Sequence, residues 1–132
     1  LRVRYYARYT DDFVIVADNQ KYLEELLPPI TDFLYRRLQL SLHPNKVFIR
    51  PHGQGIDFLG YVILPQHIMV RTKTKQRMLR KLKERISQHK EGIISEEALS
   101  ASVQSYLGVL SHADAYRLSE EVKNQFWFWL KE

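Results

Sequence analysis

The chain has 132 residues, of which 45% are hydrophobic, and its formal net charge is +5. This length suits one domain, or a small domain with an appendage, and the apolar content is sufficient for a packed core rather than a disordered segment. The absence of cysteine excludes a disulfide scaffold and a cysteine-based zinc site. No apolar run approaches the roughly 18 residues of a membrane span, so no membrane partner is expected.

Two β-prone runs at the start of the chain are joined by polar residues. Residues 2–9 contain three tyrosines and a valine, residues 13–17 read Phe-Val-Ile-Val-Ala, and Thr10, Asp11 and Asp12 separate the two runs. This pattern predicts an antiparallel hairpin. The second run is apolar throughout, as expected for a strand that is covered on both faces.

A helix is expected next, because Asp18 and Asn19 can cap a helix and apolar residues then recur at helical spacing. The pair Pro28-Pro29 predicts a kink or a restart within this helix. Further along, we expect short strands at residues 40–42 and 47–50 on either side of a turn. A strand over residues 56–64 and a last strand over residues 67–70 follow.

After Arg71 the apolar residues change to helical spacing. Three amphipathic helices are predicted: the first ends at Gly92, the second begins at Ser95, and the third reaches the end of the chain. The sequence therefore predicts an α+β fold with two parts, which are a strand-containing region at residues 1–71 and a helical region at residues 72–132.

Positive charge is concentrated at the start of this helical region. Residues 71–90 contain nine basic residues and one acid, which gives the segment a net charge of +8. A solvated helix face is the usual fate of a charge run, but such faces commonly mix signs. We therefore predict phosphate contacts from the basic residues in the first half of the segment, namely Arg71, Lys73, Lys75, Arg77, Arg80 and Lys81.

Asp11 and Asp12 are adjacent carboxylates in the predicted hairpin. Hard oxygen ligands suit Mg²⁺, and a tight hairpin would hold them rigidly. Aspartate pairs are also common in surface turns, but such turns seldom join strands as apolar as residues 13–17. A site for two metal ions generally needs a third carboxylate, for which no other acid in the chain is clearly placed.

Three motifs in order resemble bacterial reverse transcriptases, the group that includes group II intron, retron and diversity-generating retroelement enzymes. Residues 8–15 (Arg-Tyr-Thr-Asp-Asp-Phe-Val-Ile) are similar to the family's Tyr-x-Asp-Asp motif. Residues 38–46 are similar to its next motif, which closes on a lysine, and residues 58–61 (Phe-Leu-Gly-Tyr) are similar to its primer-grip motif. Residues 105–108 (Ser-Tyr-Leu-Gly) together with residues 112–114 (His-Ala-Asp) resemble thumbs of diversity-generating retroelement enzymes and related bacterial enzymes more loosely.

The resemblance implies roles for individual residues. Asp11 and Asp12 would hold two Mg²⁺ ions together with an upstream aspartate that is absent from this chain, and Tyr9 would lie near the primer terminus. Lys46 would lie near the incoming triphosphate as a candidate general acid, although a lysine after a turn is ordinarily a solvated residue. The primer 3′ end would be held by the third motif, Phe58, Leu59, Gly60 and Tyr61, which could otherwise be ordinary sheet residues.

The fold implied is a partial polymerase palm, an antiparallel sheet with a helix, followed by a three-helix thumb. The implied activity is RNA-directed DNA synthesis in a longer bacterial cytoplasmic parent, and the chain alone is expected to be inactive. Its expected partners are an RNA template, a DNA primer, deoxynucleoside triphosphates, and the fingers and N-terminal palm of the parent. The alternatives are a non-catalytic nucleic-acid-binding module, a structural or interaction domain, and an RNA-templated RNA polymerase.

Overall fold

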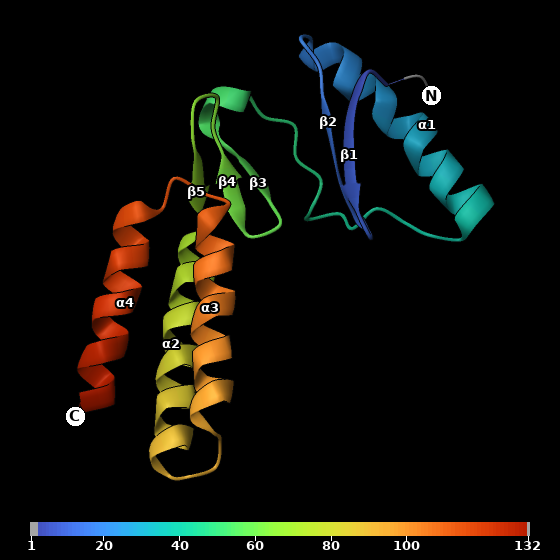
Figure 1. Ribbon diagram of the computed structural model, residues 1–132. Helices are drawn as coiled ribbons and strands as arrows, with labels where there is room; N and C mark the ends of the chain where they lie inside the picture. The colour runs from blue at the N-terminus through green and yellow to red at the C-terminus, as the bar shows by residue number, and fades with distance from the viewer. Residues whose placement is uncertain (1–2, 132) are drawn as a thin grey trace. The chain divides into compact units, whose positions relative to one another are not determined.

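The structure, a computed structural model, describes residues 3–131 and shows helices with two small antiparallel sheets (Figure 1). This arrangement confirms the expected α+β class. The chain divides into two compact units, Leu1–Gln54 and Gly55–Glu132, which are described separately below as the N-terminal and C-terminal units.

The N-terminal unit begins with the expected hairpin, formed by β1 (Tyr5–Tyr9) and β2 (Asp12–Val16). The two strands pair antiparallel, with Tyr9 opposite Asp12 at the closed end. The connection therefore contains Thr10 and Asp11 alone, whereas the sequence indicated three connecting residues. The start of the first predicted strand, at residue 2, lies outside the described residues.

Helix α1 (Gln20–Leu38) follows, and the side chain of Asn19 caps it by accepting a hydrogen bond from the Lys21 amide. The helix runs through Pro28 and Pro29 as one element, so the restart that the proline pair suggested does not occur. It ends at Gln39, whose left-handed backbone (φ 55°) allows the next amide to bond back into the last turn.

The strands predicted at residues 40–42 and 47–50 are absent from the structure of the described residues, which is irregular there. The turn between them is confirmed, because the Lys46 amide donates to the His43 carbonyl at 3.0 Å. A strand needs a neighbour to bond its backbone, and neither segment has one among residues 3–131. A single 3₁₀ turn, η1 (His52–Gln54), precedes the next strand.

The C-terminal unit opens with a three-stranded meander of β3 (Ile56–Phe58), β4 (Tyr61–Ile63) and β5 (Ile68–Val70). The prediction of one strand over residues 56–64 was wrong, because the chain reverses at Leu59 and Gly60. Both residues have positive φ, 52° and 88°. This is the two-residue turn whose twist matches that of a hairpin. The last strand is confirmed as β5.

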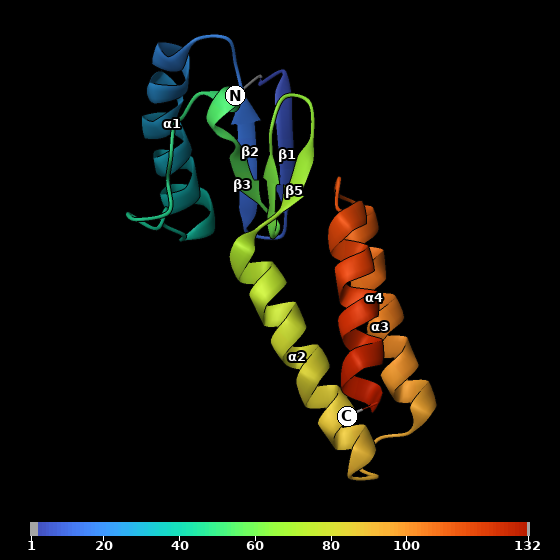
Figure 2. The ribbon, with the colours of Figure 1, turned by 90° about the vertical axis from the view of Figure 1, so that its left-hand side faces the viewer.

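The three predicted helices are present as α2 (Thr72–Lys90), α3 (Glu96–Ser111) and α4 (Tyr116–Lys131), seen from two sides in Figures 1 and 2. Ser95 caps α3 as expected, since its hydroxyl accepts from the Ala98 amide. Each helix buries its apolar stripe against the others. The resulting core contains Met78, Leu82, Ile86, Leu99, Val103, Leu110, Ala115 and Val122.

The division between the units differs in place from the one expected from sequence. The predicted boundary followed residue 71, whereas the structure separates residue 54 from residue 55. The small sheet therefore belongs with the helices, and Val70 of β5 packs against their core. Within residues 3–131, no helix is both long and apolar enough to cross a bilayer.

Candidate metal site and nucleic-acid interface

The tip of the β1–β2 hairpin carries the first candidate carboxylate. Thr10 has a φ of 52°, a conformation that a β-branched residue rarely adopts, and such conformations concentrate at functional sites. Its hydroxyl donates a hydrogen bond of 2.8 Å to Oδ1 of Asp11. The turn thus orients the Asp11 carboxylate through a neighbouring side chain.

This arrangement lowers the pKa of the Asp11 carboxyl below its ordinary value. The hydrogen bond from Thr10 is the largest cause, followed by the backbone amide of Asp11 itself. Desolvation opposes these two effects, and the positive charge of Lys46 is the smallest of the causes that lower the pKa. The lowered pKa favours the ionised carboxylate, which is the form that binds a hard cation.

Asp12 and Tyr9 form the last pair of the same hairpin. Directly opposed residues of an antiparallel pair point to the same face, so Asp12 and Tyr9 share a face next to the Asp11 tip. Both side chains are exposed, Tyr9 to 62%. The hairpin therefore presents two carboxylates and a tyrosine to solvent on one short segment.

The donor chemistry of Asp11 and Asp12 fits Mg²⁺, which binds carboxylate oxygens. The described residues contain no group of three or more histidine, cysteine, aspartate or glutamate side chains suited to holding a metal ion. Two carboxylates alone make a partial ligand set.

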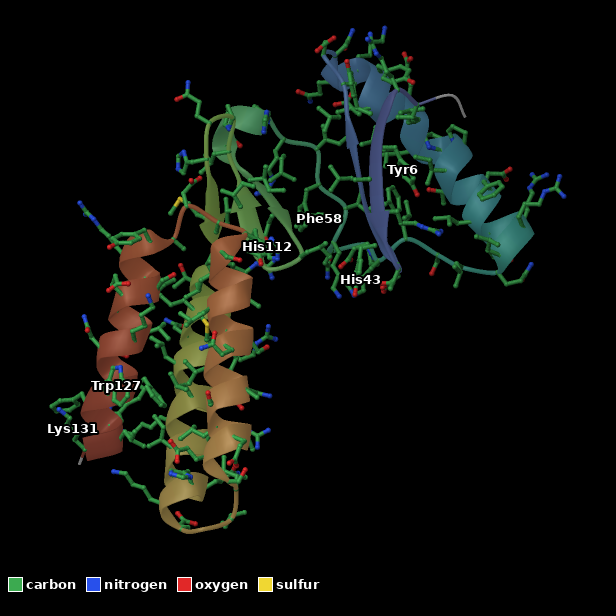
Figure 3. All side chains as sticks on the ribbon, in the orientation of Figure 1. Tyr6, His43, Phe58, His112, Trp127 and Lys131 are labelled. Atoms are coloured by element: carbon green, nitrogen blue, oxygen red, sulfur yellow. The ribbon has the colours of Figure 1, made fainter. Side chains whose placement is uncertain are left out.

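The β3–β4 hairpin carries the four candidate primer-grip residues. Phe58, labelled in Figure 3, ends β3, and Leu59 at the tip is 45% exposed. Gly60 is required at its position, because its φ is positive and a Cβ there would lie 3.1 Å from Oγ1 of Thr74. The hydroxyl of Tyr61 donates to the Val109 carbonyl in α3 at 2.9 Å. Leu59 is thus the side chain of the four that the structure leaves most open.

Some of the candidate basic residues are engaged inside the C-terminal unit. The guanidinium of Arg71 binds the carboxylate of Asp57, and Nζ of Lys75 lies 3.0 Å from Oε2 of Glu121 in α4. Arg80 pairs more loosely with Glu84 at 3.8 Å. The basic residues in these ion pairs stabilise the fold, and the sequence pattern did not distinguish them from basic residues that would bind phosphate.

A second group of basic residues follows a spacing of four along α2, which places its members on one side of the helix. All are exposed or half-exposed, and none forms an ion pair with another of the described residues. This basic stripe consists of Lys73, Arg77, Lys81 and Arg85. Arg85 belongs to the basic segment predicted from sequence but was not one of the six residues singled out, although its distance of four residues from Lys81 could have identified it.

The C-terminal half of the basic stripe borders a groove of about 540 Å³ between α2 and α3. Lys81 and Arg85 line the groove from α2, and Ser105 and Tyr106 line it from α3. Glu84 also reaches it, from its pair with Arg80. Two cations facing hydroxyl groups form a surface that suits a phosphate group. The sequence marked Ser105 and Tyr106 only as part of a loose resemblance to polymerase thumbs, and it is the packing of the helices that brings them opposite Lys81.

No family model matches the chain. It is 41% identical over 71 residues to Protein P of hepatitis B virus genotype C subtype adr (isolate Japan/A4/1994). The corresponding identities are 39% for Protein P of genotype E (isolate Cote d'Ivoire/ABI-212/2003) and 38% for Protein P of gorilla hepatitis B virus (isolate Cameroon/gor97). Each match covers 49% of this chain and 8% of the viral protein. The chain is therefore similar to a small part of these much longer relatives.

Proposed function

We propose that this chain is part of an RNA-directed DNA polymerase, to which it contributes a carboxylate hairpin for catalysis and a helical unit for nucleic-acid binding. The similarity to Protein P of the hepatitis B viruses, a reverse transcriptase, supports this broad class. These relatives are viral, so they do not support the bacterial type that the sequence motifs suggested. The proposal is accordingly a reverse transcriptase without a subtype.

The observation that carries the proposal is the geometry of the β1–β2 tip, where Thr10 donates to the Asp11 carboxylate and Asp12 shares an exposed face with Tyr9. In the proposed reaction the primer 3′ hydroxyl oxygen attacks the α-phosphate of a deoxynucleotide, and the bond to the departing pyrophosphate breaks. Bound Mg²⁺ would stabilise the charge on the attacking and leaving oxygens. Asp11 and Asp12 would hold the ions together with a carboxylate from another part of the parent.

Lys46 would support the same reaction through its charge. It belongs to the N-terminal unit, and its ammonium group already contributes to the lowered pKa of Asp11. A cation at this range would attract the triphosphate and could donate a proton to the leaving pyrophosphate. This role remains an expectation from the motif order, because the pKa shift shows only that the two charges interact.

The basic stripe would bind the phosphate backbone of the template–primer duplex. Within residues 3–131 its four side chains are free of ion pairs, and backbone phosphates are generally contacted by such side chains without regard to sequence. The groove bordered by Ser105 and Tyr106 would accept one of these phosphates. Arg71 and Lys75 are weaker candidates because their charges are paired within the chain.

Primer extension on an RNA template tests the proposal, using the full-length parent protein, Mg²⁺ and deoxynucleotides. Asp11→Ala is expected to abolish extension. Asp18→Ala is the matched control, because Asp18 is an exposed aspartate shortly after the same hairpin, outside the proposed ligand set. Equal extension by wild type and Asp11→Ala would contradict the proposal. Replacing deoxynucleotides by ribonucleotides in the same assay separates a DNA polymerase from an RNA polymerase.

A non-catalytic nucleic-acid-binding module is the second candidate, favoured by a basic stripe that needs no carboxylate. It predicts duplex binding that is unchanged by Mg²⁺ or by Asp11→Asn, together with no extension by the full-length parent. The polymerase proposal predicts extension by the parent and none by the 132-residue chain alone, since a ligand carboxylate is expected from elsewhere.

A further inference from the structure

The small sheet of the C-terminal unit has no core of its own. Its strands are three residues long, and none of their side chains is fully buried. Such a sheet is not expected to hold a fixed position by itself. The placement of the β3–β4 hairpin must therefore depend on its attachments to the helices.

Asp114, in the connection between α3 and α4, makes one of these attachments. Its Oδ2 atom accepts a hydrogen bond of 2.9 Å from the amide of Ile68, and its own amide donates 2.8 Å to the carbonyl of Ile68. Ile68 begins β5, the edge strand that pairs with β4 on its other side. Asp114 thus satisfies both outward-facing backbone groups of Ile68 and extends the sheet by one residue.

Tyr61 makes a second attachment, from the central strand. Its hydroxyl donates 2.9 Å to the carbonyl of Val109, which lies in the last turn of α3. The same carbonyl also accepts a longer hydrogen bond of 3.4 Å from the His112 amide, so the Tyr61 hydroxyl bonds directly to the capped end of α3. Tyr61 is half-buried, and its polar atom points to the helix rather than to solvent.

The hairpin turn is fixed at a third point, the start of α2. The amide of Arg71 donates 2.9 Å to the carbonyl of Gly60, and Gly60 is packed against Thr74. The central strand and the edge strand are each bonded to a different part of the helical bundle, and the tip of the hairpin packs against Thr74 of α2. A shift of the bundle would therefore move the tip with it.

We propose that Tyr61 and Asp114 are positioning residues that fix the β3–β4 hairpin on the helical bundle. The hairpin would then hold the primer end in a fixed position relative to the duplex bound by the helices. The claim about the primer rests on the proposed polymerase function. The claim that Tyr61 and Asp114 attach the hairpin to the helices does not. The Tyr61 hydroxyl is already bonded to α3, so Tyr61 acts through the placement of Leu59 at the exposed tip. Asp114 acts from a loop that is distant from the hairpin in sequence.

Hydrogen exchange in the 132-residue chain tests the structural part. Asp114→Ala is expected to speed exchange of the Ile68 amide about fivefold, the factor that corresponds to one net hydrogen bond. Asp114→Asn is expected to restore protection, because its side-chain oxygen still accepts from that amide. Unchanged Ile68 exchange in Asp114→Ala, with the fold intact by circular dichroism, would overturn the proposal.

Primer extension by the full-length parent tests the functional part. Tyr61→Phe removes only the hydroxyl and is expected to raise the KM for primer about five- to tenfold with little change in kcat. Tyr116→Phe is the matched control, since Tyr116 is an exposed tyrosine of α4, away from the sheet attachments described above. A KM for primer equal to that of wild type would contradict the positioning role.

The two experiments separate this inference from the proposed function. Suppose that Asp114→Ala loses Ile68 protection and that the wild-type parent shows no extension. This result would refute the proposed polymerase function and the positioning of the primer end, while establishing that Asp114 attaches the sheet to the helices. Extension by wild type with unaltered Ile68 exchange and unaltered primer KM in the variants would refute the positioning role and keep the polymerase.

Discussion

The two units of the chain bury their apolar residues to very different extents. In the C-terminal unit, α2, α3 and α4 close a core of eight buried residues. In the N-terminal unit, Leu26 (7% exposed) is the only large hydrophobic residue that is buried among those described. Tyrosines of β1 and the apolar residues of α1 such as Phe33 (54% exposed) remain open to solvent.

This difference indicates that the proposed binding unit supports itself, whereas the proposed catalytic hairpin does not. An isolated two-stranded hairpin is marginally stable in water. The apolar run of residues 13–17 was expected to be covered on both faces, and in the structure it is half-buried at most. Under the proposed function, other parts of the polymerase palm would cover these surfaces.

The largest expected effect is on the free energy of unfolding of the C-terminal unit, and it tests whether the two units are stabilised separately. Leu82→Ala, at a position with 0% exposure, is expected to lower the free energy of unfolding of the C-terminal unit by roughly 2–5 kcal/mol. Leu26→Ala is the matched control and should leave that transition unchanged, since Leu26 belongs to the other unit. Chemical denaturation followed by helix circular dichroism measures both. Equal shifts would mean that the units unfold as one cooperative body.

A second prediction concerns the basic stripe. Arg77→Glu with Lys81→Glu is expected to weaken duplex binding and to flatten the log–log salt dependence by about 0.9 for each backbone phosphate that the variant no longer neutralises. Arg117→Glu with Lys131→Glu changes the net charge equally on α4 and should have the smaller effect. Fluorescence anisotropy of a labelled hybrid over a series of salt concentrations measures this. Indistinguishable slopes for the two variants would show that general charge, rather than the stripe, attracts the duplex.

The N-terminus of α3 provides a smaller effect within the same unit. Ser95→Ala removes the helix cap and is expected to destabilise the C-terminal unit by about 1 kcal/mol. The same change should raise the pKa of Glu97, which the Ser95 hydroxyl lowers first and the Glu97 backbone amide second. Thermal unfolding and a carboxyl NMR titration measure the two effects. An unchanged midpoint would show that the cap is unimportant.

The sign of the pH dependence follows from the direction of that shift. The pKa of Glu97 is lower in the folded chain than its ordinary value, so its interaction stabilises the fold above the unfolded pKa. This contribution is lost as the pH falls through the folded pKa. The gap in stability between wild type and Ser95→Ala should therefore narrow in acid.

The smallest expected effect is an increase in the stability of the C-terminal unit. Leu59→Asn is expected to stabilise the C-terminal unit by roughly 0.5 kcal/mol, because asparagine tolerates the positive φ of this turn better than leucine does. Chemical denaturation measures the change. A clear loss of stability would mean that the Leu59 side chain packs on the unit, which its 45% exposure argues against.

The helical part of the fold was predictable from sequence because its signals are local. The caps at Asn19 and Ser95 and the apolar spacing of α2 to α4 lie within single segments. Strands were less predictable, because residues 40–42 and 47–50 lack partners among the described residues and no local pattern reports pairing. The reversal at Leu59 was missed because leucine is not a usual residue for a left-handed turn position.

In the candidate site, too, contacts between residues distant in sequence could not be predicted from local patterns. Asp11 and Asp12 could be identified from their place between two strands, and the structure adds the contact with Thr10 that lowers the pKa of the Asp11 carboxyl. The division of the basic residues into paired and free groups depends on where Asp57 and Glu121 lie in the folded chain. Their sequence positions alone carry no such information.

The central claim is a division of labour, with chemistry at the N-terminal hairpin and duplex binding at the C-terminal stripe. The most direct test is one titration of RNA–DNA hybrid into full-length parent, read both as binding and as extension rate. We predict that Asp11→Ala retains the Kd for hybrid and loses extension, whereas Arg77→Glu with Lys81→Glu raises the Kd and retains the rate at saturation. Loss of hybrid binding in Asp11→Ala, or loss of the saturated rate in the stripe variant, would contradict the account.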